Sequence, residues 1–181
     1  DLAADMYEEA QHRLATNGFL QYEISNWSKP GMESQHNVIY WLNEPYLGVG
    51  AGAHSWLNGQ RFSNLKSPPR YMTAVGKNYQ KIRQDPIGTM RKPFGPVEQV
   101  DATTAAIDIG ETMMMGMRLN AGVSHKRFER RFGAPLNVIF SREIDRLVSL
   151  NLVEITDEGV RLSDKGRLLG NEVFAEFISE E

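Results

Sequence analysis

The feature that most constrains the fold is the segment DPIGTMRKPFGP at residues 85–96, which holds three prolines and two glycines in twelve residues. Proline lacks a backbone N–H and fixes its own φ, so neither a continuous helix nor a central strand is expected to run through this stretch. Segments of this composition are typical of domain boundaries. We therefore expect the 181-residue chain to divide here into two portions, each long enough for a small domain.

The portion after this boundary has the pattern of a helical domain with one hairpin. The spacing of apolar residues predicts three helices, two short strands about a turn, and a last helix, at residues 97–119, 124–133, 135–151, 152–163 and 163–177. Ser124 and Ser163 are the expected N-caps, and Gly133 is the expected stop of the second helix. This order of elements is that of a winged-helix module with an additional C-terminal helix.

Charge argues against a nucleic-acid-binding role for this portion. From residue 97 on there are 10 Lys and Arg against 15 Asp and Glu, and DNA binding depends on neutralising phosphates. The basic run HKRFERR at residues 125–131 is then a solvated helix face. An acidic winged-helix interaction module that binds no nucleic acid stays as one alternative function.

The first portion is expected to mix helix and strand. Residues 1–18 predict a helix that stops at Asn17-Gly18, and residues 19–27, FLQYEISNW, predict one buried strand. Because Asp1 already lies inside the helical pattern, we expect the sequence to be a piece of a longer protein.

A second strand is expected over YLGVGAGAHSWL, after which Asn58-Gly59 predicts a hairpin turn. Gly48, Gly50 and Gly52 alternate along this strand, which would leave one face as bare backbone. Either a ligand or another chain segment can approach such a face closely.

Between these strands lies QHNVIYW, at residues 35–41. Ser34 is expected to cap a short helix on which His36 and Tyr40, four residues apart, share a face, with Trp41 on the adjoining one. Neutral imidazole is a good axial ligand for haem iron, and aromatic side chains suit a flat apolar ligand. A structural histidine packed among aromatics is the alternative, and the residues alone leave both interpretations open.

Other side chains favour structural roles. Glu23, Ser25 and Asn26 form a polar cluster that is expected to hydrogen-bond internally, with shaping of a ligand pocket as the alternative. Met114 and Met117 are expected to fill core rather than bind iron.

The sequence contains no cysteine, which excludes disulfides and thiolate-held zinc or iron–sulfur sites within these residues. It has no apolar run of about 18 residues and opens on no export signal, so we expect a cytoplasmic protein without a transmembrane segment.

Four motifs resemble one family: YEISNWSKPG, HNVIYW, YLGVGAGAHS and the tail LSDKGRLLGNEVFAEFI. They resemble the C-terminal half of the HemW family of radical-SAM haem chaperones, relatives of oxygen-independent coproporphyrinogen III oxidase (HemN). The HNxxYW pattern is typical of the HemW branch, in which its histidine is implicated in haem binding. The resemblance implies a missing N-terminal half, whose CxxxCxxC run would hold a [4Fe–4S] cluster and S-adenosylmethionine.

The same resemblance implies an α/β fold with three parts. Residues 1–65 would be the last elements of a partial, parallel (β/α)₆ radical-SAM barrel, residues 66–96 a connecting helix and linker, and residues 97–181 a HemN-type, winged-helix-like domain. A part-barrel leaves a sheet edge unpaired, so pairing with the missing half, or between copies in a homo-oligomer, is expected.

Two sets of cofactor-binding residues follow from the resemblance. The haem set is His36, as the metal ligand, with Tyr40 and Trp41; the S-adenosylmethionine set is Tyr22, Ile24, Gly52 and Ala53. The parent protein would be a haem-binding chaperone that delivers haem to an acceptor protein. The enzymatic alternative is coproporphyrinogen III oxidase, which decarboxylates propionate side chains by radical chemistry in porphyrin biosynthesis. Without a cluster, this chain alone is expected to catalyse neither reaction.

Overall fold

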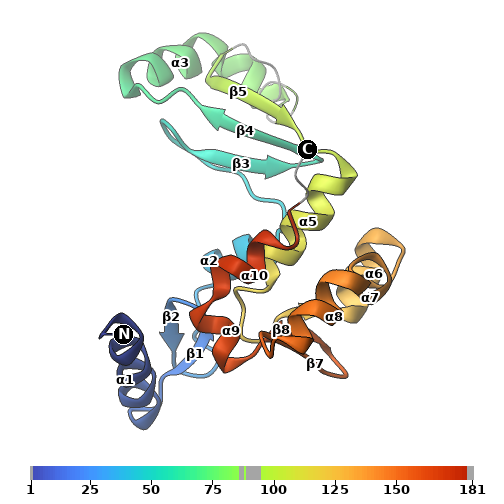
Figure 1. Ribbon diagram of the computed structural model, residues 1–181. Coiled ribbons are helices and arrows are strands. Elements are labelled where there is room, and N and C mark those ends of the chain that lie inside the picture. The colour runs from blue at the N-terminus through green and yellow to red at the C-terminus, as the bar shows by residue number, and fades with distance from the viewer. Residues whose placement is uncertain (1, 86–87, 89–94, 179–181) are drawn as a thin grey trace. The chain divides into compact units, whose positions relative to one another are not determined.

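The computed structural model describes residues 2–85, 88 and 95–178 of the chain. They form two compact units, one made of the described residues of 2–43 and 109–178 and the other of the described residues between 44 and 108 (Figure 1). The chain leaves the first unit after α2 and returns to it within α5. The division into three parts with boundaries at residues 65 and 96 stays a prediction. Most of the Pro/Gly-rich segment 85–96 lies outside the described residues.

The first unit opens with four short elements. They are α1 (Leu2–Thr16), β1 (Leu20–Glu23), β2 (Asn26–Ser28) and α2 (Gln35–Trp41). Gly18, with φ 79°, follows the end of α1 as predicted. The single strand predicted over residues 19–27 is wrong: β1 and β2 form an antiparallel hairpin. The Glu23 carboxylate makes this turn, since its Oε1 accepts hydrogen bonds from the Ser25 amide and the Asn26 side chain.

Helix α1 contributes little to the core. None of its described residues is buried, and Leu2 is 74% exposed. Near its end the Arg13 guanidinium hydrogen-bonds Glu9 and holds the pKa of that carboxyl below its ordinary value. Both side chains are exposed to solvent, so this pair adds little to stability.

The rest of the first unit is the winged-helix part. Its elements are α5 (Ala105–Gly116), β6 (Val123–Ser124), α6 (His125–Phe132), α7 (Leu136–Ile139), α8 (Ser141–Ser149), β7 (Val153–Ile155), β8 (Gly159–Leu162), α9 (Asp164–Leu168) and α10 (Gly170–Ala175). The strands form an antiparallel sheet in the order β6-β8-β7. The three predicted capping residues are confirmed: Ser124 and Ser163 accept the N-cap hydrogen bonds of α6 and α9, and Gly133 ends α6 at φ 75°.

Two of the predicted helices are each interrupted. The third becomes α7 and α8, which meet at Phe140, and the last becomes α9 and α10, which meet at Leu169. Both junction residues turn inward, since Phe140 and Leu169 pack against the core. The break in each helix thus lets an apolar side chain reach the interior.

The core of the first unit is apolar and centred on α5, α6, α8 and α10. Its fully buried side chains include Met113, Met117, Phe128, Leu136, Ile144, Val160, Val173 and Phe177. Met117 is wholly buried and Met114 packs against the same cluster, in agreement with a core-filling role. An aromatic edge contact links the junction of α7 and α8 to the segment after α10, with 5.2 Å between the ring centroids of Phe140 and Phe177.

The second unit holds an antiparallel sheet in the order β3-β4-β5, with α3 next to it in Figure 1. Its elements are β3 (His54–Leu57), β4 (Gln60–Asn64), α3 (Pro68–Gln84) and β5 (Val97–Ala102). The hairpin turn at Asn58-Gly59 is confirmed, with φ of 51° and 74° at the two residues.

The long helix predicted over residues 97–119 is wrong in its first part. Residues 97–102 are strand β5, which pairs with β4 so that Val100 lies opposite Phe62. Val97 and Phe62 are buried in the small core of this sheet. The helix begins at Ala105, where the Thr104 hydroxyl accepts a hydrogen bond from the Ile107 amide.

All strand pairs in the described part of the chain are antiparallel. The parallel pairing expected of a radical-SAM barrel is therefore not seen within it. The α/β class and the winged-helix-like C-terminal part agree with expectation, and the described residues contain helices and small sheets rather than a closed barrel.

Candidate functional site

The predicted haem motif forms the short helix α2. The Ser34 hydroxyl accepts a hydrogen bond from the Asn37 amide, which fixes the first turn. His36 is exposed, and its ring meets the Tyr40 ring edge to face, with 4.8 Å between centroids and 86° between planes. The expected shared face of His36 and Tyr40 is thus present, and it leaves the imidazole open to a ligand.

The C-terminal end of α2 is fixed to the winged-helix part by polar contacts. Asn43 is buried, and its side-chain amide donates to the Thr112 hydroxyl on α5 at 3.0 Å. From α6, Arg131 donates to the Asn43 carbonyl at 2.8 Å and Arg127 to the Leu42 carbonyl at 3.4 Å. Cations near the final carbonyls of a helix stabilise it, so these contacts position the motif helix.

We expect Arg131→Met to loosen this end of α2. The variant loses a hydrogen bond from a charged donor, which contributes about 1.5–3 kcal/mol. Faster hydrogen exchange at the α2 amides, relative to wild type, is the measurement. Arg130→Met is the matched control, because Arg130 is exposed on the same helix and should change stability by less than about 0.5 kcal/mol. Equal exchange in the two variants would contradict the positioning role.

A hollow of about 480 Å³ opens beside Trp41, entirely within the first unit. Trp41, Leu42, Leu119 and Val123 give it an apolar wall. Its charged lining residues are Lys126, Arg127, Arg131, Asp157 and Glu158. The volume lies within the range of roughly 300–1,000 Å³ that small-molecule sites occupy.

On another side, Trp41 contacts Arg118. The Arg118 guanidinium lies 4.5 Å from the centre of the Trp41 ring and 5.5 Å from that of Phe174. Cation–aromatic contacts of this kind hold the guanidinium plane in place. The Arg118 backbone carbonyl accepts a hydrogen bond from the Ile24 amide at 3.1 Å. Arg118 thereby connects the end of the β1 strand to the motif helix, and we call Ile24, Trp41, Arg118 and Phe174 the Arg118 cluster.

Buried polar atoms without partners gather around this cluster. In the described part of the chain these atoms are Glu23 Oε2, Trp27 Nε1, Trp41 Nε1, Asn64 Oδ1 and Arg118 Nε. All but the Asn64 atom belong to the first unit, near the β1–β2 hairpin and α2. Because folded proteins leave few buried polar groups unpaired, each of these atoms calls for a partner such as an ordered water, an ion or a ligand.

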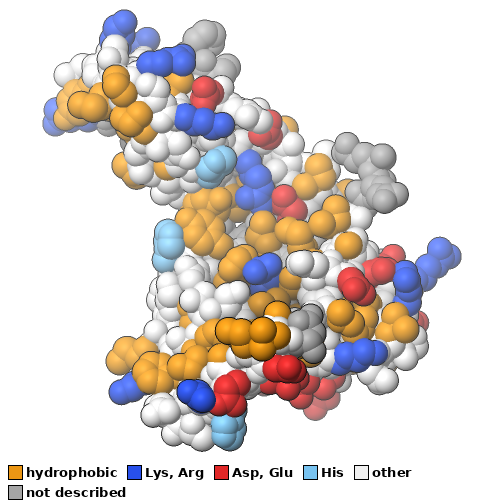
Figure 2. All heavy atoms as spheres, turned by 60° about the vertical axis from the view of Figure 1, so that its left-hand side comes forward, with side chains coloured by type: hydrophobic (Ala, Val, Ile, Leu, Met, Phe, Trp, Pro, Cys, Tyr) orange, Lys and Arg blue, Asp and Glu red, His pale blue; other side chains and the backbone are white. Residues whose placement is uncertain are grey.

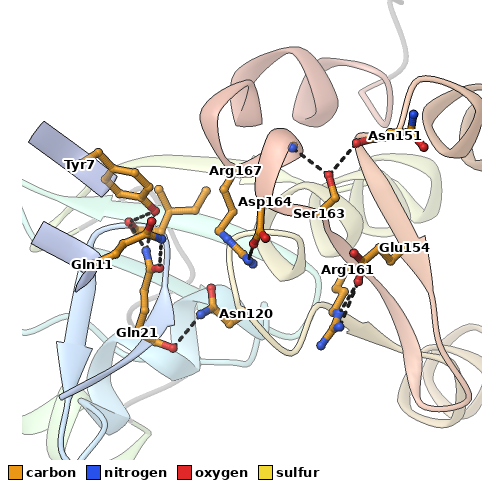
Figure 3. Close-up of polar contacts among 12 residues, drawn as sticks. Tyr7, Gln11, Gln21, Asn120, Asn151, Glu154, Arg161, Ser163, Asp164 and Arg167 are labelled. Carbon is orange, nitrogen blue, oxygen red and sulfur yellow. Dashed lines mark hydrogen bonds and ion pairs between the residues drawn. The ribbon is translucent and has the colours of Figure 1, made fainter. Parts of the chain in front are cut away.

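The residues predicted to contact S-adenosylmethionine fall in both units. Tyr22 and Ile24 lie at the β1–β2 hairpin, where the Tyr22 carbonyl accepts from the Asn120 amide and the Ile24 carbonyl from the Tyr7 hydroxyl. Figure 3 shows Tyr7, Gln11 and Gln21 joined by hydrogen bonds beside this hairpin. Ile24 and Trp41 both contact Arg118, so these two residues belong to one cluster in the first unit. Gly52 and Ala53 belong to the second unit. That these four residues bind S-adenosylmethionine stays a prediction.

The glycine segment is not the strand that we expected. Residues 47–53 form no strand: the chain turns at residues 50–52, where Gly50 and Gly52 adopt φ of 110° and 70°, and β3 begins only at His54. The buried Asn64 amide holds the turns by donating to the Gly50 carbonyl at 2.9 Å. Close packing explains Gly48, since a Cβ there would lie 2.1 Å from the His54 carbonyl oxygen.

Comparison with known proteins agrees with these features. The family HemN C-terminal domain matches residues 108–169. The heme chaperone HemW of Bacillus subtilis is 37% identical over 177 residues, which cover 98% of this chain and 43% of that protein. The corresponding protein of Lactococcus lactis is 33% identical over 181 residues, with 100% and 43% coverage. The chain belongs to the HemN/HemW family.

The HemN/HemW chain also shares its fold with a solved member. The structure titled coproporphyrinogen III oxidase (HemN) from Escherichia coli, a radical SAM enzyme, matches with a TM-score of 0.62 and 17% identity. The match covers 96% of this chain and 40% of that protein. The chain therefore spans less than half the length of the relatives that it matches.

The metal-binding capacity of this HemN/HemW chain is limited by its donors. With no cysteine, it supplies no thiolate for an iron–sulfur cluster. The residues that the structure describes contain no group of three or more His, Asp or Glu placed to hold a metal ion. Nor, within the same residues, is any helix long and apolar enough to cross a membrane.

Sequence reasoning missed three arginines of the site: Arg118, Arg127 and Arg131. No local pattern distinguishes them, because Arg118 follows a methionine run and the other two lie in a basic stretch that indicates a solvated face. His125 was also expected to be solvated, but its Nε2 lies 3.2 Å from the Thr156 carbonyl and the residue is half-buried. Their roles depend on contacts with segments distant in sequence.

Proposed function

We propose that this chain is the haem-binding part of a cytoplasmic HemW-type haem chaperone, with His36 as an axial ligand of the haem iron. The observation that carries the proposal is the exposed His36 on α2, edge to face with Tyr40. It occurs in a chain that is similar over 98% of its length to a protein named heme chaperone. The same motif supplies the Tyr40 ring beside the imidazole.

In this proposal haem is the cargo, and the chain supplies its binding site. His36 would bind the iron through a neutral ring nitrogen. Tyr40 would restrict the rotation of the imidazole, and the aromatic side chains would shield the porphyrin from water. Arg127, Arg131 and Asn43 would keep α2 in place as haem enters and leaves. An N-terminal radical-SAM half and a haem-acceptor protein are the partners that this function requires.

His36→Ala tests the proposal directly. Loss of the axial nitrogen should weaken haem binding about tenfold or more, which corresponds to about 1.4 kcal/mol or more, and should shift the Soret band. Haem titration followed by absorption is the measurement. His12→Ala is the matched control, because His12 is also an exposed helical histidine and should leave the titration unchanged. An unaltered Soret band and affinity in His36→Ala would remove His36 from the ligand role.

One observation favours an enzymatic alternative, namely the fold shared with HemN at a TM-score of 0.62. The parent protein would then be an oxygen-independent coproporphyrinogen III oxidase, whose radical-SAM half initiates propionate decarboxylation. Because this chain has no cysteine for the cluster, the assay requires the full-length parent. A chaperone should give no decarboxylation of coproporphyrinogen, whereas an oxidase should give turnover.

A purely structural interaction role through the winged-helix part has less support. Figure 2 shows Lys and Arg side chains interspersed with acidic and apolar ones on the face drawn, rather than gathered in one basic field. A nucleic-acid partner requires such a field. This distribution supports a small-molecule or protein partner over DNA.

A further inference from the structure

The guanidinium of Arg118 combines fixed orientation with unused hydrogen-bonding capacity. Its central carbon lies over the rings of Trp41 and Phe174, 4.5 Å and 5.5 Å from their centres. Its side chain makes no hydrogen bond or ion pair with any described residue, and its Nε is buried without an acceptor. A guanidinium held in this way can bind a carboxylate through two parallel hydrogen bonds in its own plane.

A cavity of about 300 Å³ lies directly beside this group, within the first unit. Arg118 and Arg167 provide two positive charges in its lining, and Ile24 and Phe174 provide apolar surface. The volume is at the lower end for ligand sites, so it suits a charged arm of a ligand better than a whole tetrapyrrole.

Two acidic residues lie near these cations. Figure 3 shows the guanidinium of Arg167 beside Asp164, with which it forms an ion pair. The Asp164 side chain is 97% exposed, so a ligand carboxylate can replace it at little cost. Glu172 also lines the cavity and opposes an incoming anion. Arg118, which has no acidic partner among the described residues, is therefore the principal anchor.

We propose that Arg118 binds a propionate carboxylate of haem, so that the ligand is held at its iron by His36 and at its edge by Arg118. This inference rests on the proposed haem-binding function. It follows from Trp41, which belongs to the same seven-residue helix as His36 and covers one face of the Arg118 guanidinium. The helical rise places the two residues about 7.5 Å apart along the axis of α2.

The test compares haem with haem dimethyl ester, in which both carboxylates are esterified. Arg118→Met should weaken haem binding by about ten- to a hundredfold and leave the affinity for the ester within about twofold of wild type. Methionine keeps a long, adaptable apolar side chain beside the two rings, which favours a folded variant. The haem affinity of Arg118→Lys should lie between those of wild type and Arg118→Met, because lysine keeps the charge and loses the bidentate geometry. Arg161→Met, which removes an exposed cation paired with Glu154, should bind both ligands as wild type does.

Each other outcome is decisive. Equal weakening for haem and its ester would make Arg118 a support for Trp41 and overturn the carboxylate role, as would an unchanged affinity for haem. Loss of haem binding in His36→Ala with none in Arg118→Met would leave the proposed function standing and remove this inference alone. Failure of the wild-type chain to bind haem would overturn both. Weakened binding of S-adenosylmethionine, another carboxylate ligand, with haem unaffected would assign Arg118 to that cofactor instead.

Discussion

Replacement of Gly122 by alanine is expected to lower the free energy of unfolding by about 3 kcal/mol or more. Gly122 adopts φ 70°, a conformation that costs an L-residue about 1–2 kcal/mol. A Cβ at this position would also lie 2.1 Å from the Val160 carbonyl oxygen and 2.7 Å from the Arg161 Cα. Those atoms belong to β8, and Val160 pairs with Val123 in the sheet, so relief of the clash requires the ladder to move.

Gly133 provides a matched control for Gly122. It has nearly the same φ, 75°, but a Cβ there would meet no atom within 4 Å. Gly133→Ala should therefore cost only the backbone strain of about 1–2 kcal/mol. Urea unfolding followed by far-ultraviolet circular dichroism gives both values, and their difference isolates the steric contribution. Equal losses of unfolding free energy in Gly122→Ala and Gly133→Ala would show that β6 and β8 separate freely at this point.

Truncation of Phe128 to alanine should destabilise the first unit by about 3–5 kcal/mol. Phe128 is 1% exposed, and its ring centroid lies 4.7 Å from that of Phe132 and 6.4 Å from that of Phe140. It also forms part of the wall of the 480 Å³ hollow beside Trp41. Removing the ring enlarges an existing void, and the surrounding helices cannot close it without losing their own contacts.

The control for Phe128 is Val138→Ala, because Val138 is apolar but 66% exposed. Its substitution should change stability by less than about 0.5 kcal/mol. The same unfolding curves measure both variants. A loss below about 1 kcal/mol in Phe128→Ala would show that the core collapses around the site, contrary to the packing described.

The elements with local signals could be predicted from the sequence. Ser34, Ser124 and Ser163 begin helices, and Gly133 ends one, because capping depends only on residues within one turn. Strand β5 could not be predicted in this way. Its residues VEQVDA are equally compatible with the start of a helix. Only pairing with β4 and burial against Phe62 make them a strand.

The candidate site likewise has one part that the sequence predicts and one part that it does not. The faces of α2 follow from the four-residue spacing of His36 and Tyr40, which a sequence displays. The Arg118 cluster does not follow from any spacing, since Arg118 meets Trp41 across 77 positions of the chain and Phe174 across 56. Similarly, the glycine alternation indicates a strand, whereas positive φ values at Gly50 and Gly52 turn the chain there.

Arg127 and Arg131 give the winged-helix part a different role here from the one that it has in DNA-binding proteins. In DNA-binding relatives of that architecture, guanidinium groups on a helix reach outward to phosphates and bases. Here these two turn back onto the carbonyls of Leu42 and Asn43. The winged-helix part thus holds the C-terminal end of the seven-residue helix α2 in place. Substitutions of Arg127 or Arg131 are therefore expected to loosen the C-terminal end of α2.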